Sequence, residues 1–183
     1  CRIMNYLHSF KPNPILYLDL HPGNLLICRE QLKLIDFDQA ALASLSQERS
    51  VCYGTKGFAA PEQYEGGTLD ERTDIYAIGA LLYYMGTGHA PEGEIKAGQG
   101  SCRGDLYILM GRCLRIEKKE RCQSVREVLK ALEKLEARIF AERHIPLLRI
   151  AAAGSRSGIG VTHTALGAVR YLRQKGVSCL YRE

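Results

Sequence analysis

The chain has 183 residues, of which 46% are hydrophobic and 25% are charged, and its formal net charge at pH 7 is +5. This composition is typical of a globular domain, and the basic residues are dispersed, so the sequence gives no sign of nucleic-acid or membrane binding. Because no apolar run reaches the ~18 residues that cross a bilayer, we expect no transmembrane helix, and we expect no signal peptide.

The seven cysteines are not arranged in C-x-x-C pairs, and their odd number argues against a closed disulfide framework. We therefore expect reduced thiols and a cytoplasmic location. The five histidines also lack the spacing of metal ligands. The length indicates one domain, or one domain and part of another.

The first elements are a helix and a hairpin. Residues 1–10 place apolar side chains at helical spacing, and the Pro-rich segment 11–14 ends that helix. An apolar run at 25–27, a polar turn at 29–31 and a second apolar run at 32–35 predict a β-hairpin.

The predicted hairpin brings three oxygen-bearing side chains together. Asp19 and Asn24 precede it with four residues between them, and Asp36 ends it. Two carboxylates and a carboxamide suit Mg²⁺, which prefers oxygen ligands, and they leave one carboxylate free to orient a nucleophile. The alternative is an ordinary polar hairpin, because Asp and Asn are common in turns.

The pattern D-x-x-x-x-N, hairpin, D-F-x resembles the catalytic and metal-binding loops of protein kinases. Residues 17–19 stand where this family has His-Arg-Asp, and residues 36–38 stand where it has Asp-Phe-Gly. The resemblance implies that Asp19 orients a protein hydroxyl and accepts its proton, while Asn24 and Asp36 hold Mg²⁺ and ATP. Small-molecule kinases share a similar D-x-H-P-x-N loop.

The next segment separates these two kinds of kinase. We expect residues 39–62 to be irregular, and their end, GTKGFAAPE, resembles the close of a protein-kinase activation segment, which small-molecule kinases as a group lack. Thr55 matches the threonine that bonds to the catalytic Asp, although it could simply be a turn residue beside Gly54. Glu62 is expected to be a buried carboxylate that needs a cationic partner.

A nearly all-apolar sequence at 70–88 predicts a helix inside the domain. It resembles the central helix of a kinase C-lobe, in which Asp74 would accept hydrogen bonds from the backbone of the catalytic loop; the simpler alternative is a helix cap. A short amphipathic helix is expected at 105–116. Arg121 resembles the partner of Glu62, and the capping box at 124–127 predicts a last long helix.

Residues 147–181 predict a strand, a glycine-rich turn at 154–162, a helix and the start of a second strand. This order resembles the first unit of the P-loop ATPases that partition plasmids or place division sites. Val161 stands at the position of the phosphate-binding Lys, and Arg156 replaces the family's signature Lys. We therefore expect no working ATPase here.

The resemblance implies a mainly α fold. Residues 1–140 would be a protein-kinase C-lobe with a small catalytic hairpin, and residues 141–183 would be the βαβ stub of a degenerate P-loop fold. The implied function is that of a serine/threonine protein kinase, with Mg²⁺ as cofactor, ATP as phosphoryl donor and a protein Ser/Thr hydroxyl as acceptor. The chain shows no glycine-rich phosphate cover and no strand Lys, so we expect either a fragment whose N-lobe lies upstream or the product of a split gene.

Three residues depart from the family pattern. Leu18 replaces an arginine that answers a phosphorylated activation segment, so we expect no control by that switch. His21, a candidate catalytic residue, replaces a lysine that touches the γ-phosphate, and Asp38 replaces a hinge glycine. The alternative function is a pseudokinase that serves as a docking module. The presence of Asp19, Asn24 and Asp36 together favours an active enzyme.

Overall fold

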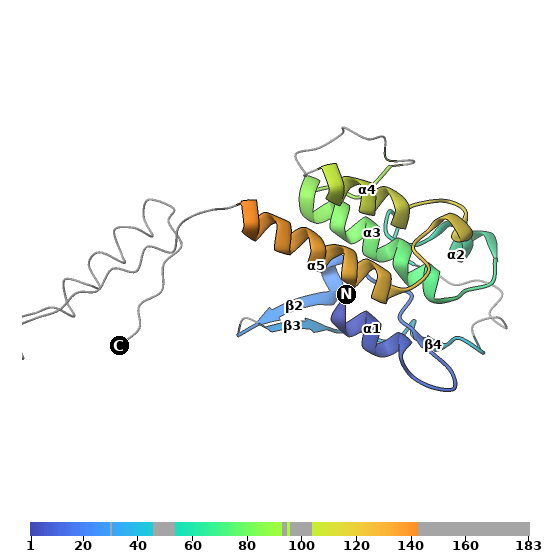
Figure 1. The fold of residues 1–183 in the computed structure, drawn as a ribbon. Coiled ribbons are helices and arrows are strands. Elements are labelled where there is room, and N and C mark those ends of the chain that lie inside the picture. The colour runs from blue at the N-terminus through green and yellow to red at the C-terminus, as the bar shows by residue number, and fades with distance from the viewer. Residues whose placement is uncertain (30, 46–53, 93–94, 96–103, 143–183) are drawn as a thin grey trace, which may run out of the picture. The chain divides into compact units, whose positions relative to one another are not determined.

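The computed structural model describes residues 1–29, 31–45, 54–92, 95 and 104–142. These residues belong to one compact unit, Cys1–Glu142, which is mostly helical and carries two small sheets (Figure 1). The P-loop segment predicted at 141–183 lies outside the described residues, apart from its first two positions.

Helix α3 (Glu71–Thr87) lies largely inside this unit, as its apolar sequence predicts, and its buried residues include Ile75, Ile78 and Tyr83. It contacts α4 (Gly104–Cys113) and strand β1 (Ile15–Leu16), while α5 (Val125–Glu142) contacts α4 and α1 (Arg2–His8). Figure 1 shows α3 running between α4 and α5.

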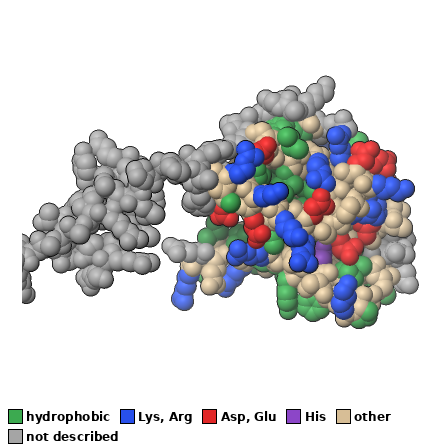
Figure 2. Space-filling model, viewed as in Figure 1, with side chains coloured by type: hydrophobic (Ala, Val, Ile, Leu, Met, Phe, Trp, Pro, Cys, Tyr) green, Lys and Arg blue, Asp and Glu red, His purple; other side chains and the backbone are tan. Residues whose placement is uncertain are grey.

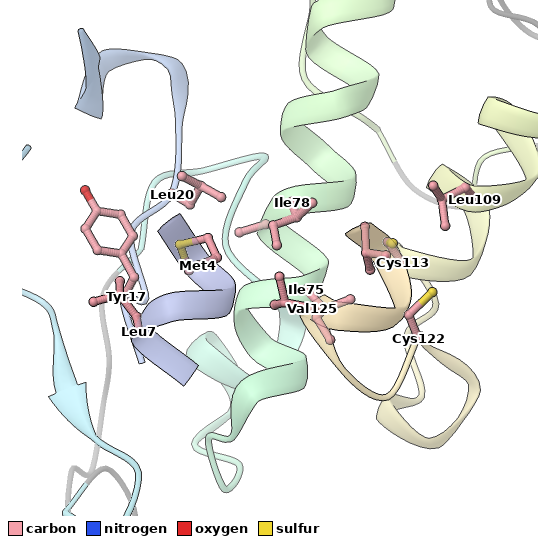
Figure 3. Close-up of a cluster of buried hydrophobic side chains, with 12 residues drawn as sticks. Met4, Leu7, Tyr17, Leu20, Ile75, Ile78, Leu109, Cys113, Cys122 and Val125 are labelled. Carbon is pink, nitrogen blue, oxygen red and sulfur yellow. The ribbon is translucent and has the colours of Figure 1, made fainter. Parts of the chain in front are cut away.

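The main hydrophobic core lies where these helices meet, and its side chains come from α1, α3, α4, α5 and the loops between them (Figure 3). Gly79 lets α3 and α4 approach closely, because a Cβ at this position would lie 2.5 Å from the Cβ of Cys113. The core's buried members are Met4, Leu7, Tyr17, Leu20, Ile75, Ala77, Ile78, Leu109, Cys113, Cys122, Val125 and Val128.

The predicted hairpin is confirmed. Strands β2 (Leu25–Cys28) and β3 (Gln31–Leu34) pair antiparallel, with Leu25 opposite Leu34. A second small sheet, β1 with β4 (Ala41–Leu42), was not predicted. Its strands are two residues long, which is too short for an alternating pattern to be recognised in the sequence.

Other boundaries differ from the sequence predictions. The segment expected to be irregular up to residue 62 ends in helix α2 (Pro61–Glu65), which follows a short turn at 56–58. Helix α4 ends at Cys113 rather than at residue 116, and a 3-10 helix, η3, covers Lys118–Glu120.

Two details of the helix ends also differ. Met85 near the end of α3 is 74% exposed, so the prediction that this helix is buried all round is wrong there. At the start of α5, Ser124 Oγ accepts the Glu127 N–H at 3.2 Å, as a capping box requires. The Glu127 carboxylate, however, accepts the N–H of Gln123 at 2.8 Å instead of that of Ser124.

The described surface mixes both signs of charge. On the face that Figure 2 shows, Lys and Arg side chains are interspersed with Asp and Glu side chains. Among the residues described, no helix has the length and apolar character needed to span a membrane.

A buried ion pair ties α2 to the loop before α5, as the sequence predicts. Nη1 and Nη2 of Arg121 donate to Oε1 and Oε2 of Glu62 at 2.7 and 2.8 Å, and the Arg121 side chain has no exposed surface. Thr73 Oγ1 also donates to Glu62 Oε1 at 3.0 Å. Arg121 further donates to the carbonyls of Arg72, Arg115 and Ile116, so this guanidinium is fully bonded.

The same contacts set the protonation of Glu62. Burial alone raises the pKa of its carboxyl, but the hydrogen bonds and charge of Arg121 outweigh burial and hold the pKa below its ordinary value of 4.5. A depressed carboxyl pKa stabilises the fold above the unfolded-state value, and this stabilisation is lost as the pH falls through the folded-state value.

We predict that Arg121→Met lowers the free energy of unfolding at pH 7 by about 3–5 kcal/mol, because Glu62 is left buried, charged and unpaired. The matched control is Arg112→Met, since Arg112 pairs with Glu127 at 2.7 Å but its side chain is 50% exposed. The free energy of unfolding of Arg112→Met should fall by less than about 1 kcal/mol.

Chemical denaturation of the three proteins between pH 4 and pH 7 measures both effects. The difference in unfolding free energy between Arg121→Met and the wild type should become smaller as the pH falls and Glu62 becomes protonated. Equal losses for the two variants would contradict the assignment of a buried, essential pair.

Candidate active site

Asp19 lies in the loop that follows β1, and its carboxylate accepts hydrogen bonds from one distant residue, Thr55, and from one nearby residue, Asn24. Thr55 donates to Oδ1 through both its hydroxyl (2.8 Å) and its backbone N–H (3.3 Å). Asn24 Nδ2 donates to Oδ2 at 3.3 Å and to the Asp19 carbonyl at 3.0 Å. The Asp19 side chain keeps 20% of its surface exposed, so it is oriented by the protein and still accessible to a reactant.

Thr55 satisfies both interpretations of the sequence. Its backbone carbonyl accepts the N–H groups of Phe58 and Ala59 at 2.9 and 3.0 Å, which makes it a turn residue. Its hydroxyl at the same time holds Asp19. The turn therefore fixes the position from which the hydroxyl reaches the carboxylate.

Asn24 ends the 3-10 helix η1 (Pro22–Asn24) and is buried. Its carbonyl accepts the N–H of Ile35 at 3.0 Å, which extends the hairpin ladder and places Asn24 opposite the residue that precedes Asp36. The hairpin thus returns the chain, as predicted, to the loop that carries Asn24, at the residue before Asp36.

Asp36 is exposed and has a positive φ of 57°. Asp tolerates this left-handed conformation better than most residues because its side chain can bond locally. Here its Oδ1 accepts the N–H of Asp38 at 3.3 Å. Asp38, which stands where the family has glycine, is not among the described residues with positive φ, so this conformation needs no glycine there.

The free oxygens of this loop fit a hard cation. Within the described part of the chain, the hydrogen bonds of the Asn24 side chain come from its Nδ2, and that of the Asp36 side chain involves its Oδ1. The described residues hold no cluster of three or more His, Cys, Asp or Glu side chains suited to a metal. Mg²⁺ commonly takes only one or two protein oxygens and completes its shell with water and phosphate, so Asn24 and Asp36 are the residues of this loop that could hold it.

His21 is held beside Asp19 in one tautomer. Its Nδ1 accepts the N–H of Gly23 at 3.1 Å, so in the neutral ring the proton is on Nε2, which lies 3.6 Å from Asp19 Oδ2. Gly23 is required by this contact, because a Cβ there would lie 2.8 Å from the imidazole Cε1. His21 thus presents an N–H donor next to the carboxylate.

Asp74, fully buried in α3, accepts three hydrogen bonds at 2.8 Å. The backbone N–H of Tyr17 and His8 Nε2 bond to its Oδ2, and the N–H of Leu18 bonds to its Oδ1. The alternative role as helix cap belongs to Asp70, whose carboxylate accepts the N–H of Arg72 at 2.8 Å. Asp74 therefore fixes the backbone just before Asp19.

The backbone of Leu18 has a strained conformation. Its φ is 67°, a conformation that costs a non-glycine residue about 1–3 kcal/mol and persists only where the surroundings enforce it. Its side chain, 2% exposed, packs with Leu16 and Leu69 in a separate apolar cluster. Its carbonyl accepts a hydrogen bond at 2.8 Å from Nε2 of Gln63, a residue that sequence reasoning did not single out.

Tyr17 is a second residue whose role was missed. Its hydroxyl donates to the carbonyl of Ile35 at 2.5 Å, and its ring meets that of Phe37 edge-on, with centroids 5.2 Å apart. Burial, together with the nearby carboxylates, raises the pKa of Tyr17 to about 12, so the hydroxyl stays a donor at neutral pH. Tyr17 thereby joins the Asp19 loop to the segment that carries Asp36.

Comparison with known proteins agrees with this geometry. Residues 1–144 match the family model described as protein kinase domain. The chain therefore belongs to the protein kinase family.

Three relatives illustrate the similarity. The chain is 30% identical over 166 residues to "Serine/threonine-protein kinase A" of Synechocystis sp., covering 77% of this chain and 32% of that protein. It is 37% identical over 94 residues to "DNA damage-responsive serine/threonine-protein kinase RqkA" of Deinococcus radiodurans (49% and 14%). It is 36% identical over 97 residues to "Serine/threonine-protein kinase PknB" of Mycolicibacterium smegmatis (50% and 15%). The chain thus spans about a third or less of these relatives' lengths.

We predict that Asp74→Ala costs about 3–5 kcal/mol of unfolding free energy, because two buried backbone N–H groups lose a charged acceptor. Asp105→Ala is the control, since the Asp105 side chain is 46% exposed and pairs with Arg138 at the surface. Its cost should be below about 1 kcal/mol. Equal melting shifts in the two variants would show that Asp74 is not the anchor of this loop.

Proposed function

We propose that this chain is the C-lobe of a serine/threonine protein kinase that transfers the γ-phosphoryl group of ATP to a protein hydroxyl. The observation that carries the proposal is the convergence of Thr55 and Asn24 on the partly exposed carboxylate of Asp19. Thr55 belongs to a segment that small-molecule kinases as a group lack. The names of the relatives, which include several serine/threonine-protein kinases, support the same acceptor class.

In this mechanism, Asp19 orients the acceptor hydroxyl and takes its proton during transfer. Thr55 and Asn24 keep the carboxylate in one rotamer, which reduces the reorganisation needed for reaction. The Nε2–H of His21 offers a donor to a phosphate oxygen, although a neutral imidazole supplies less charge than a lysine. Asn24 and Asp36 would hold Mg²⁺, which when bound offsets the negative charge of the phosphates.

The hairpin surface supports the presence of a second lobe in the active enzyme. Leu26, Ile27 and Leu32 on β2 and β3 are 50%, 81% and 53% exposed. In this family the glycine-rich loop and the strand Lys that cover the phosphates lie on an N-lobe. The sequence of residues 1–142 has no G-x-G-x-x-G pattern, so we propose that the apolar hairpin faces an N-lobe supplied from outside this segment.

Control by activation-segment phosphorylation is not part of the proposal. A phosphorylated residue acts by recruiting a cationic partner, and Leu18 is buried and apolar at the position where the family has arginine.

We further propose that the protein works in a reducing compartment such as the cytoplasm. The four described cysteines, which are Cys1, Cys28, Cys113 and Cys122, are free thiols and thus support this location.

We predict that Asp19→Asn and Asp36→Asn fail differently in the full-length protein that carries this chain. Asp36→Asn should weaken Mg·ATP binding as well as turnover. Asp19→Asn should leave nucleotide affinity within about twofold and slow transfer by ~10²–10⁴-fold, the usual range for a general base. The exposed Asp105→Asn is the control.

Calorimetry with Mg·ATP and transfer of labelled phosphate to a protein acceptor measure the two effects. If both variants lose binding equally, the division of roles is wrong. If neither changes transfer by even tenfold, the protein is a docking module of kinase fold rather than an enzyme.

We also predict that residues 1–183 alone transfer no phosphate, because the cover over the ATP phosphates is missing. Incubation with Mg·ATP and a protein acceptor should give the same background as the Asp19→Asn variant. Metal-dependent phosphorylation that disappears in Asp19→Asn would refute the need for a second lobe.

A further inference from the structure

Gln63, in the first turn of α2, is buried at 1% exposure although its side chain is an uncharged amide. Such a group is costly to bury unless its donor and acceptor are both used. Its Nε2 donates to the carbonyl of Leu18 at 2.8 Å, and its Oε1 accepts the N–H of Ala60 at 2.9 Å. The side chain therefore connects two segments that lie 45 residues apart in the sequence.

The first of these contacts acts directly on the backbone of Asp19. The Leu18 carbonyl belongs to the peptide group that joins Leu18 to Asp19, and Leu18 has the positive φ of 67°. The Asp74 carboxylate accepts the N–H of Leu18 at 2.8 Å, but this bond does not hold the peptide group between Leu18 and Asp19. The Gln63 amide fixes the orientation of that peptide, and the direction of the Asp19 Cα–Cβ bond follows from it.

The Gln63 amide also packs against the backbone next to Thr55. A Cβ at Gly54 would be 2.9 Å from Gln63 Nε2 and 2.4 Å from the Cβ of Ala59, so the backbone of Gly54 packs directly on the amide. Gly54 precedes Thr55, whose hydroxyl bonds to Asp19 Oδ1. Gln63 thus touches the backbone that leads into each member of the Asp19–Thr55 pair.

We propose that Gln63 is a positioning residue for Asp19: its side-chain amide sets the Leu18–Asp19 peptide and aligns it with the Gly54–Thr55 segment. The inference rests on the proposed kinase function. Leu18 cannot pair with a phosphorylated activation segment as the family's arginine does. In this proposal, a permanent hydrogen bond from the neutral Gln63 amide aligns the two segments instead.

Three variants of the full-length protein test this role. Gln63→Glu keeps the acceptor for the Ala60 N–H and removes the donor to the Leu18 carbonyl, whereas Gln63→Leu removes both. Gln123→Leu is the matched control, because the Gln123 amide also donates to backbone carbonyls, but to those of Lys118, Lys119 and Arg121, which lie outside the Asp19 loop.

We expect Gln63→Glu and Gln63→Leu to lower kcat by about 10- to 100-fold, as small displacements of a reacting group do. The Kd for Mg·ATP should stay within twofold of the wild-type value, because Asn24 and Asp36 are held by other contacts. Gln123→Leu should keep at least half of the wild-type kcat. All rates are measured at a temperature at which circular dichroism shows each variant to be folded.

Hydrogen exchange separates this inference from the proposed function. In both Gln63 variants the Asp19 amide, which shares its peptide group with the Leu18 carbonyl, should exchange at least tenfold faster than in Gln123→Leu, whether or not the wild type transfers phosphate. A wild type without transfer refutes the kinase proposal alone. Unchanged exchange at the Asp19 amide, a kcat above half of the wild-type value in Gln63→Glu, or an equal loss of kcat and nucleotide affinity would overturn the positioning role.

Discussion

The active-site loop depends on one buried carboxylate. Asp74 has no exposed surface and no cationic Lys or Arg partner among the described residues; the backbone N–H groups of Tyr17 and Leu18, together with His8, satisfy it. Buried charge is tolerated only when hydrogen bonds replace the lost water, so these contacts are obligatory. The consequence is that α3, which carries Asp74, sets the position of the two backbone N–H groups just before Asp19.

The remaining contacts build outward from that anchor. Tyr17 reaches the Ile35 carbonyl, and Thr55 brings the segment before α2 to the Asp19 carboxylate. The Glu62–Arg121 pair then attaches α2 to the loop before α5. Each link joins residues distant in sequence through a directional bond, which explains how a small, mostly helical unit holds an exposed polar site in one arrangement.

The sequence predicts the elements better than it predicts these links. Hydrophobic periodicity is sufficient to identify α1, α3 and the β2–β3 hairpin, and family resemblance correctly pairs Glu62 with Arg121. It misses Tyr17 and Gln63, because their side chains bond to backbone carbonyls 18 and 45 residues away and leave no local pattern. The two-residue strands of the β1–β4 sheet are missed for a similar reason, since they form only through tertiary contact.

The central claim is that the Asp19 site performs phosphoryl transfer to a protein hydroxyl. Mass spectrometry of a general protein acceptor, after incubation with the full-length protein and Mg·ATP, tests it most directly. The account predicts phosphate on serine or threonine side chains, and none when the metal is chelated. Nucleotide binding with no modified hydroxyl on any acceptor or on the protein itself would contradict it.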